Sequence, residues 1–118
     1  MAGSKKVYEL HGSVLRNTCT HCQTKYSLED MMKLRGNEGI PRCSKCGAII
    51  KPDVVLYEEG LDEYTLYSAI HAIEQADLLI VGGTSLVVYP AAGLINYFHG
   101  KHLVLINKDS TNMDSKAD

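Results

Sequence analysis

Four cysteines in two Cys-x-x-Cys pairs are the residues whose type and spacing point most directly to chemistry. Cys19 and Cys22 form the first pair, and Cys43 and Cys46 form the second, with twenty residues between the pairs. Each pair can turn two thiolates toward one point, and four thiolates complete the tetrahedron that zinc prefers. The spacing therefore predicts one zinc ion held by all four sulfurs. Four sulfur ligands leave no open position for water, so we expect a structural rather than a catalytic ion.

Three other interpretations of these residues are weaker. Two disulfides would need an oxidising compartment, but the start of the chain lacks the apolar stretch of a secretory signal, and we expect a cytoplasmic protein. A redox dithiol needs one Cys-x-x-Cys at a helix start rather than two pairs facing each other. His21 lies inside the first pair and could replace one cysteine as a ligand. With four thiolates available, we expect it in a solvated loop.

The length and charge of the chain argue against several classes of partner. With 118 residues, the chain has room for one domain of ordinary size or for part of a larger one. The formal net charge is -2, and the basic residues stand apart rather than on one face, so we expect no direct contact with nucleic acid. No apolar run approaches the length that spans a bilayer, and we expect no membrane partner.

Outside the cysteine segment, the apolar pattern alternates between strands and helices. Four runs suit strands, at residues 5–10, 54–57, 78–81 and 103–106. Helical spacing predicts a helix over 62–75, and Pro90 can begin another that ends near His99. The last two strands are typical of strands buried on both faces of a parallel sheet. We therefore expect an α/β fold, a partial Rossmann-like parallel sheet with an inserted four-cysteine zinc-ribbon module.

Open parallel sheets bind ligands at the carboxyl ends of their strands, and two such ends carry polar residues here. Gly83, Thr84 and Ser85 follow the strand predicted at 78–81, and Asn107, Lys108 and Asp109 follow the strand predicted at 103–106. Glycine lets a ligand approach the backbone closely, and the hydroxyl and amide groups can bond to ribose or phosphate. On local sequence alone, however, an ordinary tight turn is the simpler interpretation of the first segment.

In their order and spacing, these segments resemble the sirtuins, the NAD-dependent protein-lysine deacylases of the silent information regulator family. Glu9-Leu10-His11-Gly12 is similar to the family's Glu-Leu-His-Gly segment, and the two cysteine pairs follow at the family's spacing. Residues 51–59 are similar to the stretch that borders the acyl-lysine channel. Residues 83–92 are close to a family signature, and Ile106-Asn107 matches the strand at the adenosine ribose.

The resemblance implies a complete enzyme that transfers the acyl group of a modified lysine to ADP-ribose and releases nicotinamide. His11 would be its catalytic base, because a neutral imidazole is basic at cellular pH; without the resemblance it would be an ordinary turn residue. The cosubstrate NAD would be bound by Gly83, Thr84, Ser85, Asn107, Lys108 and Asp109. The partner would be an acylated-lysine protein or peptide, bound by Val55, Tyr57, Glu58, Val87, Val88 and Tyr89. The alternative interpretation is plain core packing for Val87, Val88 and Tyr89, and strand burial for Val55.

The chain also departs from the family pattern. The Gly-Ala-Gly-x-Ser, Pro-Asp-Phe-Arg and Gln-Asn-Ile-Asp segments of sirtuins do not occur, and Glu58 stands where the family usually has glycine. We therefore expect a fragment without the N-terminal Rossmann half and the extreme C-terminus, inactive by itself. Its parts would be 1–15 with the histidine turn, 16–50 as the zinc module and 51–118 as the rest of the Rossmann-like domain. Uncovered strand edges and apolar faces predict that it self-associates.

Two functions of other classes stay open at this point. One is a non-catalytic zinc-ribbon interaction module, although the α/β remainder is longer than a ribbon needs and no basic face favours nucleic acid. The other is a nucleotide-binding regulatory domain.

Overall fold

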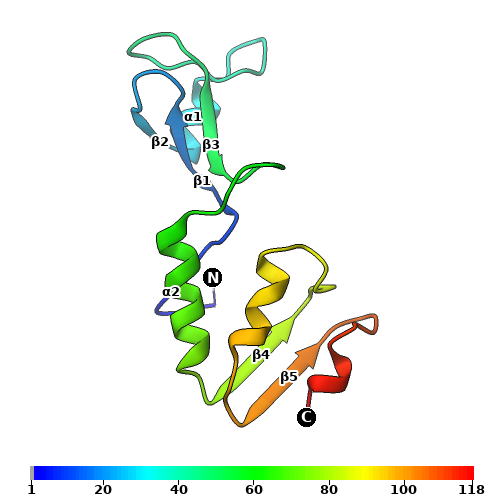
Figure 1. Cartoon of the computed structure of the whole chain (residues 1–118). Coiled ribbons are helices and arrows are strands. Elements are labelled where there is room, and N and C mark those ends of the chain that lie inside the picture. The colour runs from blue at the N-terminus through cyan, green and yellow to red at the C-terminus, as the bar shows by residue number, and fades with distance from the viewer. Residues whose placement is uncertain (1) are drawn as a thin grey trace. The chain divides into compact units, whose positions relative to one another are not determined.

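The structure, a computed structural model that describes residues 2–118, divides into two compact units (Figure 1). Residues 11–61 hold all four cysteines and are called the cysteine unit. Residues 2–10 and 62–118 are called the sheet unit. These limits differ from the divisions predicted after residues 15 and 50, because the strand before the cysteines pairs with the strand after them. None of the described helices is long and apolar enough to cross a membrane.

Three antiparallel strands and one short helix build the cysteine unit. β1 (Gly12–Cys19) lies between β2 (Lys25–Ser27) and β3 (Ile50–Val54). α1 (Leu28–Lys33) follows β2 directly. The buried core consists of Cys19, Met31, Cys43 and Ile50. Because two of these four side chains are cysteines, apolar burial alone gives this unit little stability.

Two strand predictions for the first half of the chain are wrong. Residues 5–10 pair with no strand among the described residues, and the first strand begins only at Gly12. The strand predicted at 54–57 instead begins at Ile50 and ends at Val54. In both places β-forming side chains extend beyond the residues that have a strand to pair with, and pairing decides where a strand forms.

Gly12 determines how closely β1 approaches β3. Its φ is 77°, in the left-handed region, and it pairs with Val54. A Cβ atom at this position would overlap the carbonyl oxygen of Asp53. Glycine therefore suits both the backbone angle and the space.

Gly12→Ala is expected to destabilise the cysteine unit by more than the roughly 1–2 kcal/mol of left-handed backbone strain, because β3 must also move. The matched control is Gly36→Ala, since Gly36 has a φ of 57° and nothing lies within 4 Å of its added Cβ. Denaturant unfolding of the zinc-loaded chain measures both losses. Equal losses would show that contact with β3 contributes nothing.

Two parallel strands and their helices build the sheet unit. In chain order they are α2 (Glu63–Glu74), β4 (Leu78–Gly82), the 3-10 helix η1 (Ala91–Tyr97), β5 (His102–Ile106) and the 3-10 helix η2 (Asp114–Lys116). β4 and β5 pair in parallel over their full lengths, so their carboxyl ends meet at one edge. The predicted helix over 62–75, both predicted strands and their parallel pairing are therefore confirmed. The helix predicted from Pro90 is shorter than expected, because Phe98 already adopts an extended backbone.

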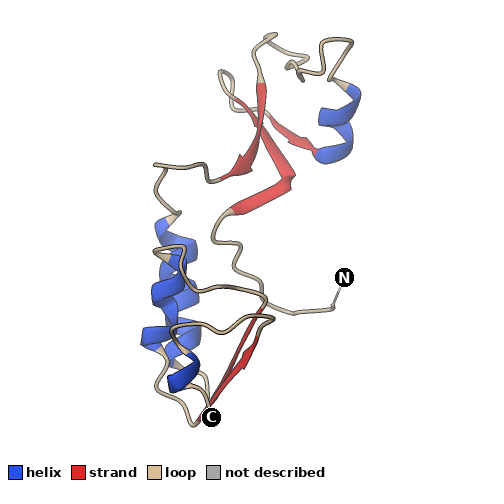
Figure 2. Cartoon of the chain, turned by 90° about the vertical axis from the view of Figure 1, so that its right-hand side faces the viewer, coloured by secondary structure: helices blue, strands red, loops and turns tan. Residues whose placement is uncertain are grey.

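The sheet of β4 and β5 buries only one of its faces. Leu79, Val81, Leu103 and Leu105 belong to a core that includes residues of η1. On the other face, Leu78 is 50% exposed and Ile80 is 58% exposed. Figure 2 shows α2 and η1 on the same side of the strands. The prediction of strands buried on both faces is wrong for the described residues, because the helices cover only one face.

Candidate functional site

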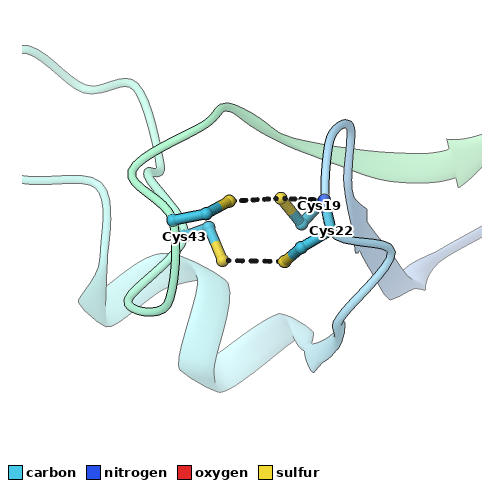
Figure 3. Close-up of side chains that lie close together, drawn as sticks. Cys19, Cys22 and Cys43 are labelled. Carbon is cyan, nitrogen blue, oxygen red and sulfur yellow. Dashed lines mark hydrogen bonds between the residues drawn. The ribbon is translucent and has the colours of Figure 1, made fainter.

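The four cysteine side chains meet at one point of the cysteine unit (Figure 3). Their Sγ atoms all lie within 4.8 Å of one another, and Cys19–Cys46 and Cys22–Cys43 are Sγ pairs 3.5 Å apart. Four sulfurs at ~2.3 Å from a tetrahedral zinc ion would lie about 3.8 Å from one another. The observed separations therefore fit zinc. All four cysteines are free of disulfides.

A tight backbone turn shapes each Cys-x-x-Cys pair. In the first turn, the Gln23 N–H donates to the Cys19 carbonyl at 3.2 Å, and in the second the Gly47 N–H donates to the Cys43 carbonyl at 2.8 Å. Gln23 and Gly47 both have positive φ, 61° and 77°. The two pairs therefore use the same left-handed turn, although only the second has glycine at that position.

The thiols of this cluster differ in their affinity for protons. The Tyr26 hydroxyl, 3.0 Å from the Cys43 Sγ, is the main cause that lowers the pKa of Cys43 to about 6. The Ala48 N–H acts to lower the pKa of Cys46, but the Cys19 thiol, burial and the Cys22 and Cys43 thiols together outweigh it and raise this pKa to about 11. Thiolates this close repel one another, so all four lose their protons only when a cation compensates the charge.

His11 lies in the turn that precedes β1 of the cysteine unit. Its side chain is exposed, and its backbone carbonyl accepts a hydrogen bond from the Val55 N–H at 2.9 Å. This backbone hydrogen bond therefore links His11, the expected catalytic base, to Val55, which is expected to contact the substrate. His21 is exposed and is not one of the four clustered metal-ligand candidates.

The residues after β3 form a turn rather than a strand edge. Tyr57 is fully exposed, and Glu58 has a φ of 68°. The Glu59 carboxylate accepts a hydrogen bond from the Leu56 N–H at 2.8 Å and holds this turn. A peptide bound here would therefore meet exposed side chains, not a regular strand edge from this segment.

The residues predicted to bind NAD lie at the carboxyl edge of β4 and β5 in the sheet unit. The Gly83 N–H donates to the Ile106 carbonyl at 2.9 Å, and the φ of Gly83 is 66°. The Asn107 Nδ2 donates to the Thr84 carbonyl at 2.8 Å and ties the two strand ends together. Asn107, Lys108 and Asp109 line one hollow with Leu105 and Ser110. Parallel pairing has thus brought the predicted ribose-binding groups to one edge.

The next loop residues are exposed rather than packed in a core. Val87, Val88 and Tyr89 are 65%, 61% and 63% exposed, whereas Leu86 before them is buried. Core packing is therefore the wrong interpretation of these three side chains in the described structure. Their exposure is compatible with a binding role.

Comparison of the sequence with known protein families identifies the family of this chain. A sequence model of the Sir2 family matches residues 1–90. The chain belongs to the Sir2 family. A Clostridium perfringens protein named NAD-dependent protein deacetylase is 65% identical over 119 residues, which cover 100% of this chain and 48% of that protein. A Staphylococcus aureus protein of the same name is 47% identical, covering 98% of this chain and 46% of that protein.

Solved Sir2 structures agree with this assignment. A structure described as Sir2 with a p53 peptide and NAD+ is 43% identical, with a TM-score of 0.87 over 98% of this chain and 49% of that one. A Sir2 structure bound to a propionylated peptide gives the same identity, TM-score and coverage. This Sir2 chain therefore spans about half the length of the curated relatives and solved structures that it matches.

The cysteine spacing did not predict two hydroxyl groups that lie beside the four-cysteine cluster. The Tyr26 Oη lies 3.0 Å from the Cys43 Sγ, and the Thr24 Oγ1 lies 3.2 Å from the Cys22 Sγ. Both residues follow the first cysteine pair closely in the sequence. Nearness in sequence was the only available signal, and the contact of Tyr26 with the second pair depends on how the chain folds back.

Proposed function

We propose that this chain is part of an NAD-dependent protein-lysine deacylase. The observation that carries the proposal is the edge of β4 and β5, where the Asn107–Thr84 hydrogen bond joins the two polar segments of a chain in the Sir2 family. The relatives named above as NAD-dependent protein deacetylases support the same activity.

The donors and acceptors at this edge suit a ribose. Because the Asn107 Nδ2 donates to Thr84, the Asn107 Oδ1 is the atom left to accept from a ribose hydroxyl. The Thr84 Oγ1 accepts from the Leu86 N–H at 3.2 Å, which leaves its own hydrogen as a donor. Gly83 adds close backbone approach, and Ser85, Lys108 and Asp109 add further polar groups.

NAD, when bound, would supply a ribose carbon that releases nicotinamide and takes up the acyl oxygen. His11, whose side chain is exposed, would then remove a proton from a ribose hydroxyl as a general base. The hydrogen bond from the Val55 N–H holds the backbone of His11, and this fixes the position of the backbone atoms that carry the imidazole.

The proposed substrate is a peptide that carries an acylated lysine. The residues proposed to contact it are Val55, Tyr57, Glu58, Val87, Val88 and Tyr89. Solved Sir2 structures that hold acetylated and propionylated peptides support this class of substrate. Zinc at Cys19, Cys22, Cys43 and Cys46 would have no part in the reaction and would hold the cysteine unit together.

A chimera tests the activity. The 118 residues replace the aligned segment of the Clostridium perfringens relative, and NAD-dependent deacylation of an acetyl-lysine peptide is measured together with nicotinamide release. The chimera is expected to be active, with the unaltered relative as the control. A folded, zinc-loaded chimera without either activity would contradict the proposal.

We also propose that the isolated 118-residue chain self-associates through the uncovered face of its sheet. Leu78, Ile80, Val104 and Ile106 expose apolar surface there, and such surface favours pairing with a second copy. Light scattering at low micromolar concentration is expected to show a dimer or larger, and Ile80→Lys is expected to shift it toward monomer. A stable monomer of the unaltered chain would contradict this.

A further inference from the structure

Tyr26 is placed so that its own hydroxyl reaches the four-cysteine cluster. Its ring packs against the core of the cysteine unit, and its backbone lies opposite Asn17 in the pairing of β1 with β2. Its hydroxyl oxygen lies 3.0 Å from the Cys43 Sγ and 3.2 Å from the Ser44 Oγ. Strand pairing and ring packing therefore fix the hydroxyl beside one ligand sulfur.

The chemistry of a metal-bound thiolate settles the direction of this hydrogen bond. A cysteine that binds zinc has lost its proton, so Cys43 can only accept and the Tyr26 hydroxyl must donate. The Ser44 hydroxyl can then donate to the Tyr26 oxygen, which strengthens Tyr26 as a donor. The Lys45 N–H, 3.4 Å from the same sulfur, is a second donor.

The side-chain donors are unevenly distributed over the cluster. Among residues 2–118, Cys22 has the Thr24 hydroxyl and Cys43 has the Tyr26 hydroxyl, while Cys19 and Cys46 have backbone N–H groups and each other's sulfur at 3.5 Å. Four thiolates and one Zn²⁺ carry a net charge of minus two. Donors to the sulfurs disperse this charge, and a charged acceptor makes such bonds stronger than neutral ones.

We propose that Tyr26 is a positioning residue of the metal centre, whose hydroxyl donates to the Cys43 thiolate and thereby increases zinc retention. The bond fixes the orientation of the Cys43 side chain and withdraws electron density from its sulfur. Groups that hold metal ligands in this way commonly contribute about 10-fold or more to metal affinity. This role does not depend on the proposed deacylase activity.

Tyr26→Phe in the whole 118-residue chain tests the proposal, because phenylalanine keeps the ring and removes only the hydroxyl. Zinc affinity, measured by competition with a chromophoric chelator, is expected to fall about 10-fold. Tyr67→Phe deletes an exposed hydroxyl of α2 in the sheet unit and is expected to keep the parent affinity. Ser44→Ala leaves the Tyr26–Cys43 bond in place and is expected to lose less affinity than Tyr26→Phe.

Cobalt substitution provides a readout that loss of packing alone would not move. With Co²⁺ in the cluster, loss of the hydrogen bond makes the Cys43 sulfur a better electron donor, so the sulfur-to-cobalt charge-transfer band is expected to move to longer wavelength in Tyr26→Phe. The visible bands of tetrahedral cobalt are expected to stay unchanged. A 3-fluorotyrosine at position 26, a stronger donor of nearly the same shape, is expected to move the charge-transfer band the opposite way.

The proposal is overturned if Tyr26→Phe matches Tyr67→Phe in zinc affinity and in the charge-transfer band. It is also overturned if the affinity falls while the band stays in place, because Tyr26 would then act only through packing. If Tyr26→Phe fails to fold, the 3-fluorotyrosine chain decides, and an unshifted band there contradicts the proposal.

Discussion

Removing zinc with a chelator is expected to unfold the cysteine unit while α2, β4 and β5 of the sheet unit persist. The reason is the size of its buried core, in which Cys19 and Cys43 are metal-ligand candidates and only Met31 and Ile50 are ordinary apolar residues. Structural zinc can contribute on the order of 10 kcal/mol to folding, more than this core can supply. Circular dichroism during chelation, with amide hydrogen exchange read separately for each unit, measures the loss.

The stoichiometry is part of the same prediction. One equivalent of zinc per chain is expected, and Cys43→Ser is expected to lose it, because the serine hydroxyl does not ionise as a thiol does at neutral pH. His21→Ala is the matched control within the first cysteine pair and is expected to keep the metal. Two disulfides, or a metal-free chain that stays folded between Cys19 and Cys46, would contradict the prediction.

The four-cysteine cluster could be predicted from the sequence because the spacing within each Cys-x-x-Cys pair is a local feature. A Cys-x-x-Cys pair fixes two ligands by its own turn, and only the meeting of two pairs depends on the fold. The hydroxyl of Tyr26 depends on more, namely the pairing of β2 with β1 and the return of the chain to Cys43. No spacing rule expresses that contact, so the sequence did not indicate it.

The same distinction explains the strands. The runs at 78–81 and 103–106 are apolar throughout and pair with each other, so composition alone located β4 and β5. In the cysteine unit, β1 contains the polar residues Arg16, Asn17 and Thr18, so a search for apolar runs does not find it. It is nevertheless a strand, because its ends pair with β3 at Gly12 and Cys19. Partner availability, not side-chain propensity, set these boundaries.

His11→Ala in the chimera is expected to lower kcat/KM for deacylation by at least about 100-fold, the contribution expected of a positioned general base. The fold should not change, since the link to Val55 uses the backbone carbonyl of His11, which alanine retains. Zinc content and circular dichroism verify this. His21→Ala, which removes another exposed imidazole of the cysteine unit, is the control and is expected to keep full activity.

A second assay separates the role of the base from NAD binding. Exchange of labelled nicotinamide into NAD is expected to persist in His11→Ala, because nicotinamide leaves before a ribose hydroxyl must lose its proton. Loss of both exchange and deacylation would instead place His11 in binding. Full deacylation by His11→Ala would remove His11 from the chemistry altogether, and a different group would then have to be the base.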